Sequence, residues 1–182
     1  MTATRRPSLP LDLVLLGLLL ATVAVVVFRA RARSGPPVPL GTPLPPLQVE
    51  GWVNLPPGQS FDPHGRLTVV TLFATWCGPC RAELPLLAQL AAAYRPAGVE
   101  FLHITQESSR DLRQIEQLVA STPGFTWPVA YGGVEVFKAI PSDGGIPTVI
   151  LFGPSGRAIW SGPGSFGLDR ALDEALAARP RT

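Results

Sequence analysis

Cys77 and Cys80 are the only two cysteines in the 182-residue chain. A C-x-x-C pair can be a redox dithiol, half of a zinc site, or a coincidence. A structural zinc site needs four ligands, and beyond the cysteines only His64 and His103 could supply imidazoles. His103 alternates within a predicted strand, where a histidine is more often a packed residue than a ligand. The pair therefore favours a redox-active disulfide without metal or cofactor, with zinc and coincidence as alternatives.

Each residue around the pair has a part in a redox mechanism. Cys77 is expected at a helix N-terminus, where free amide groups and the helix dipole stabilise a thiolate that attacks a disulfide. Cys80 lies one turn later and is placed to resolve the mixed disulfide. Pro79 opens the helix without losing a hydrogen bond, and Gly78 leaves the approach to the sulfur open. Trp76 would offer an apolar contact to the substrate, or would simply fill the core.

The elements on either side of the cysteines predict an α/β domain. The apolar run at 67–73 suits a strand buried on both faces, and a helix follows the cysteines to about Tyr94. The remaining predicted elements are a strand at 99–105, a helix at 109–120, strands at 148–152 and 157–161, and a helix at 168–176. The order β-α-β-α-β-β-α predicts a mixed sheet, because alternation gives a parallel pair and the closing hairpin is antiparallel.

The N-terminal region predicts a membrane anchor. Residues 13–28 carry no charge, and the apolar stretch extends to a span of 9–28 behind a short tail, 1–8. This length fits the short end of the range for transmembrane helices. A cleaved signal peptide and a buried core helix are the alternatives. Arginines flank both sides of the span, so the positive-inside rule gives no orientation.

Residues 29–47 begin with basic residues and become proline-rich, with six prolines in 34–47. Such a segment favours an extended polyproline conformation, which predicts a linker between the anchor and a globular domain at 48–182. An irregular arm lying on the domain is the alternative.

Composition narrows the function further. The chain has 15 basic and 13 acidic residues, and the local excess of arginine before residue 34 accounts for its net charge of +2. No basic stripe remains for phosphates, which argues against a nucleic-acid partner. The hydrophobic share of 46% is sufficient for a buried core.

Two segments resemble thioredoxins. Residues 73–85, FATWCGPCRAELP, are similar to the active-site signature of membrane-anchored bacterial thioredoxins, the TlpA/ResA-like group. Gly145-Ile146-Pro147-Thr148 resembles the loop that carries a cis-proline facing the active-site sulfurs. The resemblance implies a thioredoxin fold, with a mixed central sheet flanked by helices, over 48–182 behind the N-terminal transmembrane helix. It also implies that Pro147 is cis and that the Ile146 backbone pairs with an extended substrate segment. An ordinary strand-entry proline is the alternative.

The same resemblance implies a function. Members of this group are single-pass, membrane-tethered thiol-disulfide oxidoreductases whose catalytic domain lies on the periplasmic side of the cytoplasmic membrane. Their protein substrates include the haem-attachment cysteines of apocytochromes c and the thiols of copper-site assembly, and an integral-membrane thiol protein donates the electrons. The expected roles are therefore cytochrome c-type biogenesis and cell redox homeostasis. The Gly-Pro dipeptide resembles that of reducing thioredoxins.

Three other functions remain open. The first is a dithiol oxidase or isomerase. The second is a thiol peroxidase, although Cys77 lacks the upstream Pro-x-x-x-Thr-x-x context that is typical of peroxiredoxins. The third is a non-catalytic chaperone that holds a metal or an apocytochrome with its dithiol.

One position departs from the thioredoxin pattern. Thioredoxins usually carry a buried aspartate six residues before the first cysteine, which helps to take the proton from the second thiol. Here Thr71 occupies that position, and its hydroxyl cannot act as a base near neutral pH. Glu83, the nearest carboxylate in sequence on the helix, is the candidate for proton transfer, with a solvated helix charge as the alternative.

Overall fold

The computed structural model describes Thr22, residues 37–142 and residues 145–179. The chain divides after residue 35, and the second unit contains the fold reported below. Within the described part, no helix combines the length and the apolar character that a membrane span requires. The predicted anchor at 9–28 and the tail before it lie, apart from Thr22, outside the described residues, so both stay predictions.

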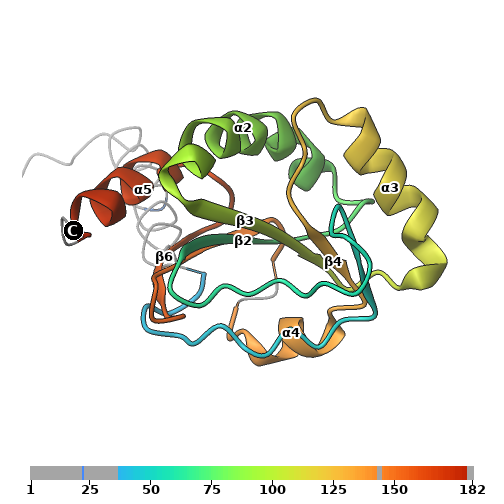
Figure 1. The fold of residues 1–182 in the computed structure, drawn as a ribbon, viewed down its shortest axis with the longest axis horizontal. Coiled ribbons are helices and arrows are strands. Elements are labelled where there is room, and N and C mark those ends of the chain that lie inside the picture. The colour runs from blue at the N-terminus through green and yellow to red at the C-terminus, as the bar shows by residue number, and fades with distance from the viewer. Residues whose placement is uncertain (1–21, 23–36, 143–144, 180–182) are drawn as a thin grey trace, which may run out of the picture. The chain divides into compact units, whose positions relative to one another are not determined.

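A six-stranded mixed sheet forms the centre of the domain (Figure 1), in the order β1-β4-β3-β2-β5-β6. β2 pairs in parallel with β3, and β3 with β4, whereas β1–β4, β2–β5 and β5–β6 are antiparallel. All seven residues of β2 are buried, because both of its faces are covered. The strands are β1 (Gly51–Val53), β2 (Leu67–Phe73), β3 (Val99–Thr105), β4 (Val129–Tyr131), β5 (Thr148–Phe152) and β6 (Ala158–Gly162).

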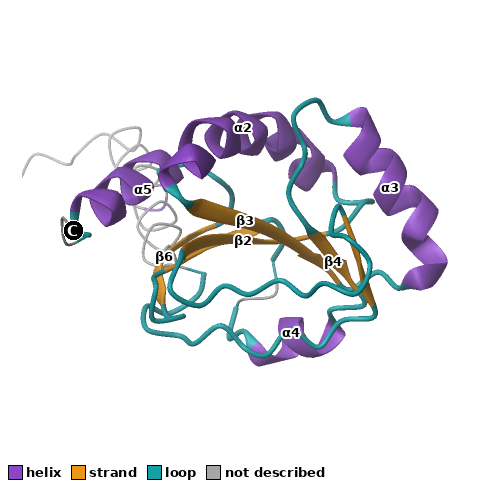
Figure 2. Ribbon diagram, in the orientation of Figure 1, coloured by secondary structure: helices purple, strands orange, loops and turns teal. Residues whose placement is uncertain are grey.

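Helices cover both faces of this sheet. Three of them, α2, α3 and α5, lie over one face, and α4 lies over the other (Figures 1 and 2). Their bounds are α2 (Gly78–Tyr94), α3 (Leu112–Ser121), α4 (Val134–Ala139) and α5 (Leu168–Ala177), with short 3-10 helices at η1 (Arg95–Ala97) and η2 (Ser109–Asp111). The mixed α/β arrangement predicted from the sequence is therefore confirmed.

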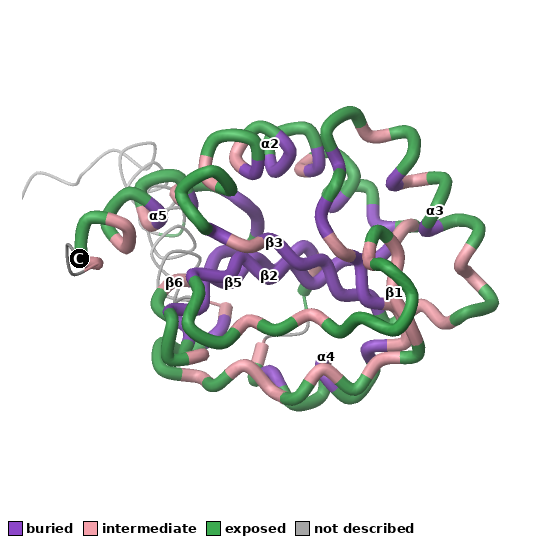
Figure 3. Tube along the Cα trace, in the orientation of Figure 1, coloured by how far each residue is buried: buried purple, intermediate pink, exposed green. Residues whose placement is uncertain are grey.

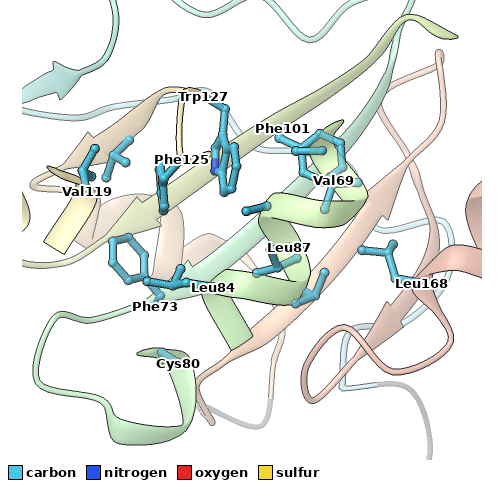
Figure 4. Packing of buried hydrophobic residues seen from close by; sticks show 14 of the residues in the cluster. Val69, Phe73, Cys80, Leu84, Leu87, Phe101, Val119, Phe125, Trp127 and Leu168 are labelled. Atoms are coloured by element: carbon cyan, nitrogen blue, oxygen red, sulfur yellow. The ribbon is translucent and has the colours of Figure 1, made fainter. Parts of the chain in front are cut away.

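The helix that follows the cysteines is anchored by one apolar side. Its buried residues are Cys80, Leu84, Leu87, Ala88 and Ala91. They recur every three or four residues and therefore share one face. Figure 4 shows Leu84 pointing toward Phe73 of β2, and Figure 3 shows that burial is concentrated in the central strands. The start of α2 is thus fixed against the sheet, and the cysteines are fixed with it.

Residues 37–47 differ from the linker that the prolines predict. Val38 is buried, its N–H donates to Ser161 Oγ (3.1 Å), and the Ser161 hydroxyl donates to the Val38 carbonyl (2.8 Å). The Gly41 N–H donates to the carbonyl of Ala158, and the Ala158 N–H donates to the carbonyl of Thr42 (both 2.8 Å). Prolines lack an N–H, but the residues between them supply donors that reach the edge of the sheet. The arm alternative therefore describes this segment, and the domain includes it.

Three short elements were not predicted. β1 and β4 have three residues each and α4 has six. Segments of this length contain fewer than two full periods of the strand or helix pattern, so the hydrophobic pattern gives no clear signal for them.

Candidate active site

Cys77 and Cys80 form a disulfide, with 5.2 Å between their Cα atoms. Both side chains are buried; Cys77 is the N-cap of α2 and Cys80 lies in its first turn, shortly after β2 ends at Phe73. This is the strand-to-helix junction that the sequence predicts. The structure shows the oxidised state of the dithiol, which confirms the predicted disulfide.

Cys77 caps the helix with its sulfur. The Cys80 N–H donates to Cys77 Sγ at 3.1 Å, and Pro79 occupies the first turn, where its missing N–H removes no helical hydrogen bond. After reduction, the same N–H and the positive end of the helix dipole favour negative charge on Cys77. A Cβ added at the exposed Gly78 would meet nothing within 4 Å, so the space there is open. This geometry suits Cys77 as the attacking sulfur.

The second predicted segment meets this sulfur. The Ile146–Pro147 peptide bond is cis, as the resemblance implies, and Pro147 is buried. The Ile146 carbonyl oxygen lies 3.7 Å from Cys77 Sγ. The Thr148 hydroxyl donates to the carbonyl of Gly145 (2.7 Å), which ties the loop to the start of β5. Pairing of the Ile146 backbone with a substrate stays a prediction.

A cleft of about 400 Å³ is lined by residues next to Cys77 in sequence or in space. Trp76 forms one wall of it and Ile146 another, so the cleft lies between the cysteine loop and the cis-proline loop. Trp76 is 75% exposed, which excludes the alternative that it fills the core. Phe73, Thr105, Glu107 and Phe137 also line the cleft, which gives it apolar walls and one carboxylate.

Glu107 is a site residue that the sequence analysis missed. Its carboxylate accepts hydrogen bonds from the Thr75 N–H (2.8 Å), the Thr75 hydroxyl and the Thr105 hydroxyl (2.9 Å). These contacts hold residue 75, and with it the loop that presents Trp76 and Cys77. One signal could have found it: β2 and β3 are parallel, so residues that follow the two strands meet at one edge of the sheet.

Glu83 and Thr71 lie on either side of Cys80 in the sequence. The Glu83 carboxylate accepts from the Ser165 N–H (2.9 Å) and from the Ser165 hydroxyl, which joins α2 to the loop between β6 and α5. Thr71 is buried, and its hydroxyl has no hydrogen-bond partner among the described residues. Proton transfer by Glu83 therefore stays a prediction, whereas its structural contact to Ser165 is observed.

The histidines lie apart from this chemistry. His103 is a buried core residue, as its alternation in the strand predicts. The Trp127 Nε1–H donates to His103 Nδ1 (2.8 Å), and the rings of Phe73 and Phe125 contact its imidazole edge to face. Burial lowers the pKa of His103 to about 3, so its imidazole is neutral at physiological pH. His64 lies on an exposed loop, where it pairs with Asp62.

Comparison with known proteins agrees with a thioredoxin-like redox site at Cys77 and Cys80. Residues 57–156 match the family model AhpC/TSA. The thiol-disulfide oxidoreductase ResA of Oceanobacillus iheyensis is 28% identical over 123 residues, covering 68% of this chain and 62% of that protein. This chain therefore spans less than two thirds of that relative's length. ResA of Geobacillus thermodenitrificans is 24% identical over 156 residues, covering 84% of this chain and 86% of that protein.

A solved structure shows the fold. A thioredoxin-like protein in its oxidised form matches with a TM-score of 0.64 at 17% identity, over 77% of this chain and 98% of that one. The chain has a thioredoxin-like fold, and its sequence is similar to those of ResA thiol-disulfide oxidoreductases. Since the family model spans more than half of its residues, the chain belongs to the AhpC/TSA family.

Proposed function

We propose that this protein is a membrane-tethered, extracytoplasmic thiol-disulfide oxidoreductase that reduces disulfides in partner proteins. One observation carries the proposal: the Cys77–Cys80 disulfide lies at the start of α2, with the Cys80 N–H directed at Cys77 Sγ. A helix N-terminus is where a thiolate nucleophile is stabilised, and Trp76, the residue before Cys77, lines the cleft of about 400 Å³.

The reaction is a two-step exchange that starts from the reduced dithiol. The Cys77 thiolate attacks one sulfur of the partner disulfide, which forms a Cys77–partner disulfide and releases the other partner sulfur as a thiolate. Cys80 loses its proton and attacks Cys77 Sγ, which forms the Cys77–Cys80 disulfide and releases the second partner thiol. Two electrons pass from the dithiol to the partner, and a thiol donor must then reduce this protein again.

Location and partners belong to the same proposal. The apolar span at 9–28 anchors the chain in the cytoplasmic membrane, with the domain on the periplasmic side. Similarity to ResA proteins supports this arrangement. The substrates are disulfides formed by the cysteines of apocytochrome c or of a copper site, and an integral-membrane thiol protein is the donor. Labelling of a reduced, single-cysteine Cys80→Ser chain in intact cells by a membrane-impermeant maleimide tests the location; protection until lysis contradicts it.

The chemistry is tested by removal of the resolving thiol. In Cys80→Ser, Cys77 can attack but nothing resolves the product, so a mixed disulfide with the partner accumulates and is released by dithiothreitol. Cys77→Ser is the matched control, because it keeps one cysteine but lacks the attacking sulfur, and it should trap far less. Absence of any trapped adduct, together with normal function of Cys80→Ser, would instead support a chaperone that only holds its cargo.

A further inference from the structure

Phe166 is 97% exposed, more than any other large apolar side chain that the structure describes. Its loop is nevertheless fixed. Ser165 is buried, and both its N–H (2.9 Å) and its hydroxyl donate to the Glu83 carboxylate. Gly164 (φ 129°) and Gly167 (φ 83°) adopt left-handed backbone conformations on either side, which favour glycine. The loop thus holds an aromatic ring in water on a rigid backbone.

The same arrangement occurs at the active site. The Thr75 N–H (2.8 Å) and hydroxyl donate to Glu107, and the next residue is the exposed Trp76. In both places one carboxylate holds the N–H and the hydroxyl of the residue that precedes an exposed aromatic side chain. We call each of these carboxylate contacts, Glu107–Thr75 and Glu83–Ser165, a clamp. Both clamps include a residue on a segment that carries a cysteine. Thr75 lies two residues before Cys77, and Glu83 lies on the helix that carries Cys80.

A typical protein–protein interface is large enough for one partner to contact both aromatic residues. Glu83 lies about 9 Å along α2 from Cys77 at the helical rise of ~1.5 Å per residue. A partner that buries about 800 Å² covers a circular patch of about 16 Å radius. A protein that presents its disulfide to Cys77 therefore extends past Glu83, the residue that the Ser165 loop contacts, whereas a small disulfide does not. Rigid aromatic side chains lose little entropy on binding and are enriched among the residues that dominate protein interfaces.

We propose that Phe166 is a docking residue for the partner protein whose disulfide Cys77 attacks, and that the Glu83–Ser165 clamp holds it in position. The inference rests on the proposed function and adds a second contact, in the loop between β6 and α5. Its occupant is a polypeptide with apolar surface near its disulfide. Phe166 thereby favours protein disulfides over small ones.

The test compares a protein disulfide with a small one. The reduced full-length chain is assayed for reduction of insulin and of bis(2-hydroxyethyl) disulfide. The rate constant for insulin divided by that for the small disulfide is then compared between variants. Phe166→Ser should lower this ratio by about 5- to 10-fold, as expected for a residue that anchors an interface. Phe166→Leu should restore much of it, because an apolar contact remains. Leu40→Ser, which removes another exposed apolar side chain (62%), should leave the ratio unchanged.

The other outcomes are equally distinct. An unchanged ratio in Phe166→Ser would overturn the docking role and leave the proposed function intact. An equal loss with both substrates would also overturn it, since that pattern indicates damage to the dithiol site. A wild-type dimer that Phe166→Ser converts to monomers in sedimentation would make a second copy of this chain the occupant. Failure of the wild type to reduce either substrate would overturn the proposed function and the inference with it.

Discussion

Two buried polar atoms on the neighbouring strands β2 and β3 have no hydrogen-bond partner among the described residues. Thr71 and His103 are register partners across β2 and β3, and among the described residues Thr71 Oγ1 and His103 Nε2 make no hydrogen bond. Because the Trp127 Nε1–H occupies Nδ1, the neutral His103 ring carries its proton on Nε2. A ring in this state does not accept a proton at Nε2. His103 therefore does not replace the aspartate that thioredoxins carry at the Thr71 position.

The depressed pKa of His103 predicts a fold that weakens in mild acid. Its pKa is about 3 in the folded chain and 6.5 in the unfolded one, so the unfolded chain binds the extra proton. The stability from this group is complete above pH ~6.5 and falls as the pH drops toward 3. Between pH 7.5 and pH 5 the free energy of unfolding should fall by about 2 kcal/mol, measured by urea denaturation.

The His103→Phe variant tests whether His103 causes this fall in the free energy of unfolding. The substitution keeps an aromatic ring in the cluster but removes the titratable group, at the cost of an unpaired Trp127 N–H. The variant should be less stable at neutral pH and should lose less stability between pH 7.5 and pH 5. Parallel pH curves for the two proteins would show that other groups cause the acid sensitivity.

At the scale of elements, the segment at 37–47 gives the sharpest prediction. It contributes the buried Val38 and the hydrogen bonds to β6. A chain truncated to begin at residue 48 should therefore be less stable than one that begins at residue 37. Burial of a valine side chain contributes about 1.5–3 kcal/mol, and each lost hydrogen bond about 1 kcal/mol, so the difference should reach several kcal/mol. Equal urea midpoints for the two truncated chains would show that the segment contributes nothing.

The sequence predicts the central strands and the helix between them correctly, but it does not predict where the segment at 37–47 lies. The strand at 67–73, the helix through Tyr94 and the strand at 99–105 were predicted with their observed bounds, because their apolar patterns are long and their turns are marked. The proline-rich arm was predicted as a linker, because proline content indicates an extended chain but not what it lies against. Glu107 was missed for a related reason. Its role depends on strands that are neighbours in space, which a linear pattern does not encode.

At the scale of the whole molecule, the fold sets how readily the dithiol gives up electrons. The sheet, covered on both faces, holds the start of α2 and the cis-proline loop against each other, so the environment of Cys77 is rigid. In that environment the Cys80 N–H favours the Cys77 thiolate, whereas the Ile146 carbonyl oxygen at 3.7 Å opposes it. Burial of Cys80 disfavours a second charge. Of the two thiols, only Cys77 therefore has a contact among the described residues that favours its anion.

The Cys77–Cys80 disulfide predicts a chain that is more stable when oxidised than when reduced. The disulfide closes a loop of four residues in the unfolded state, which corresponds to about 2 kcal/mol in the chain-entropy model. The oxidised protein should unfold at higher urea than the reduced one. The Cys77→Ala/Cys80→Ala variant should not respond to reductant. A more stable oxidised form is typical of a reductant with a potential of about −270 mV. Strong oxidants, with potentials of about −120 mV, owe that potential to a stabilised reduced form. A reduced chain that proves the more stable would reverse the direction of electron flow and make this protein a dithiol oxidase.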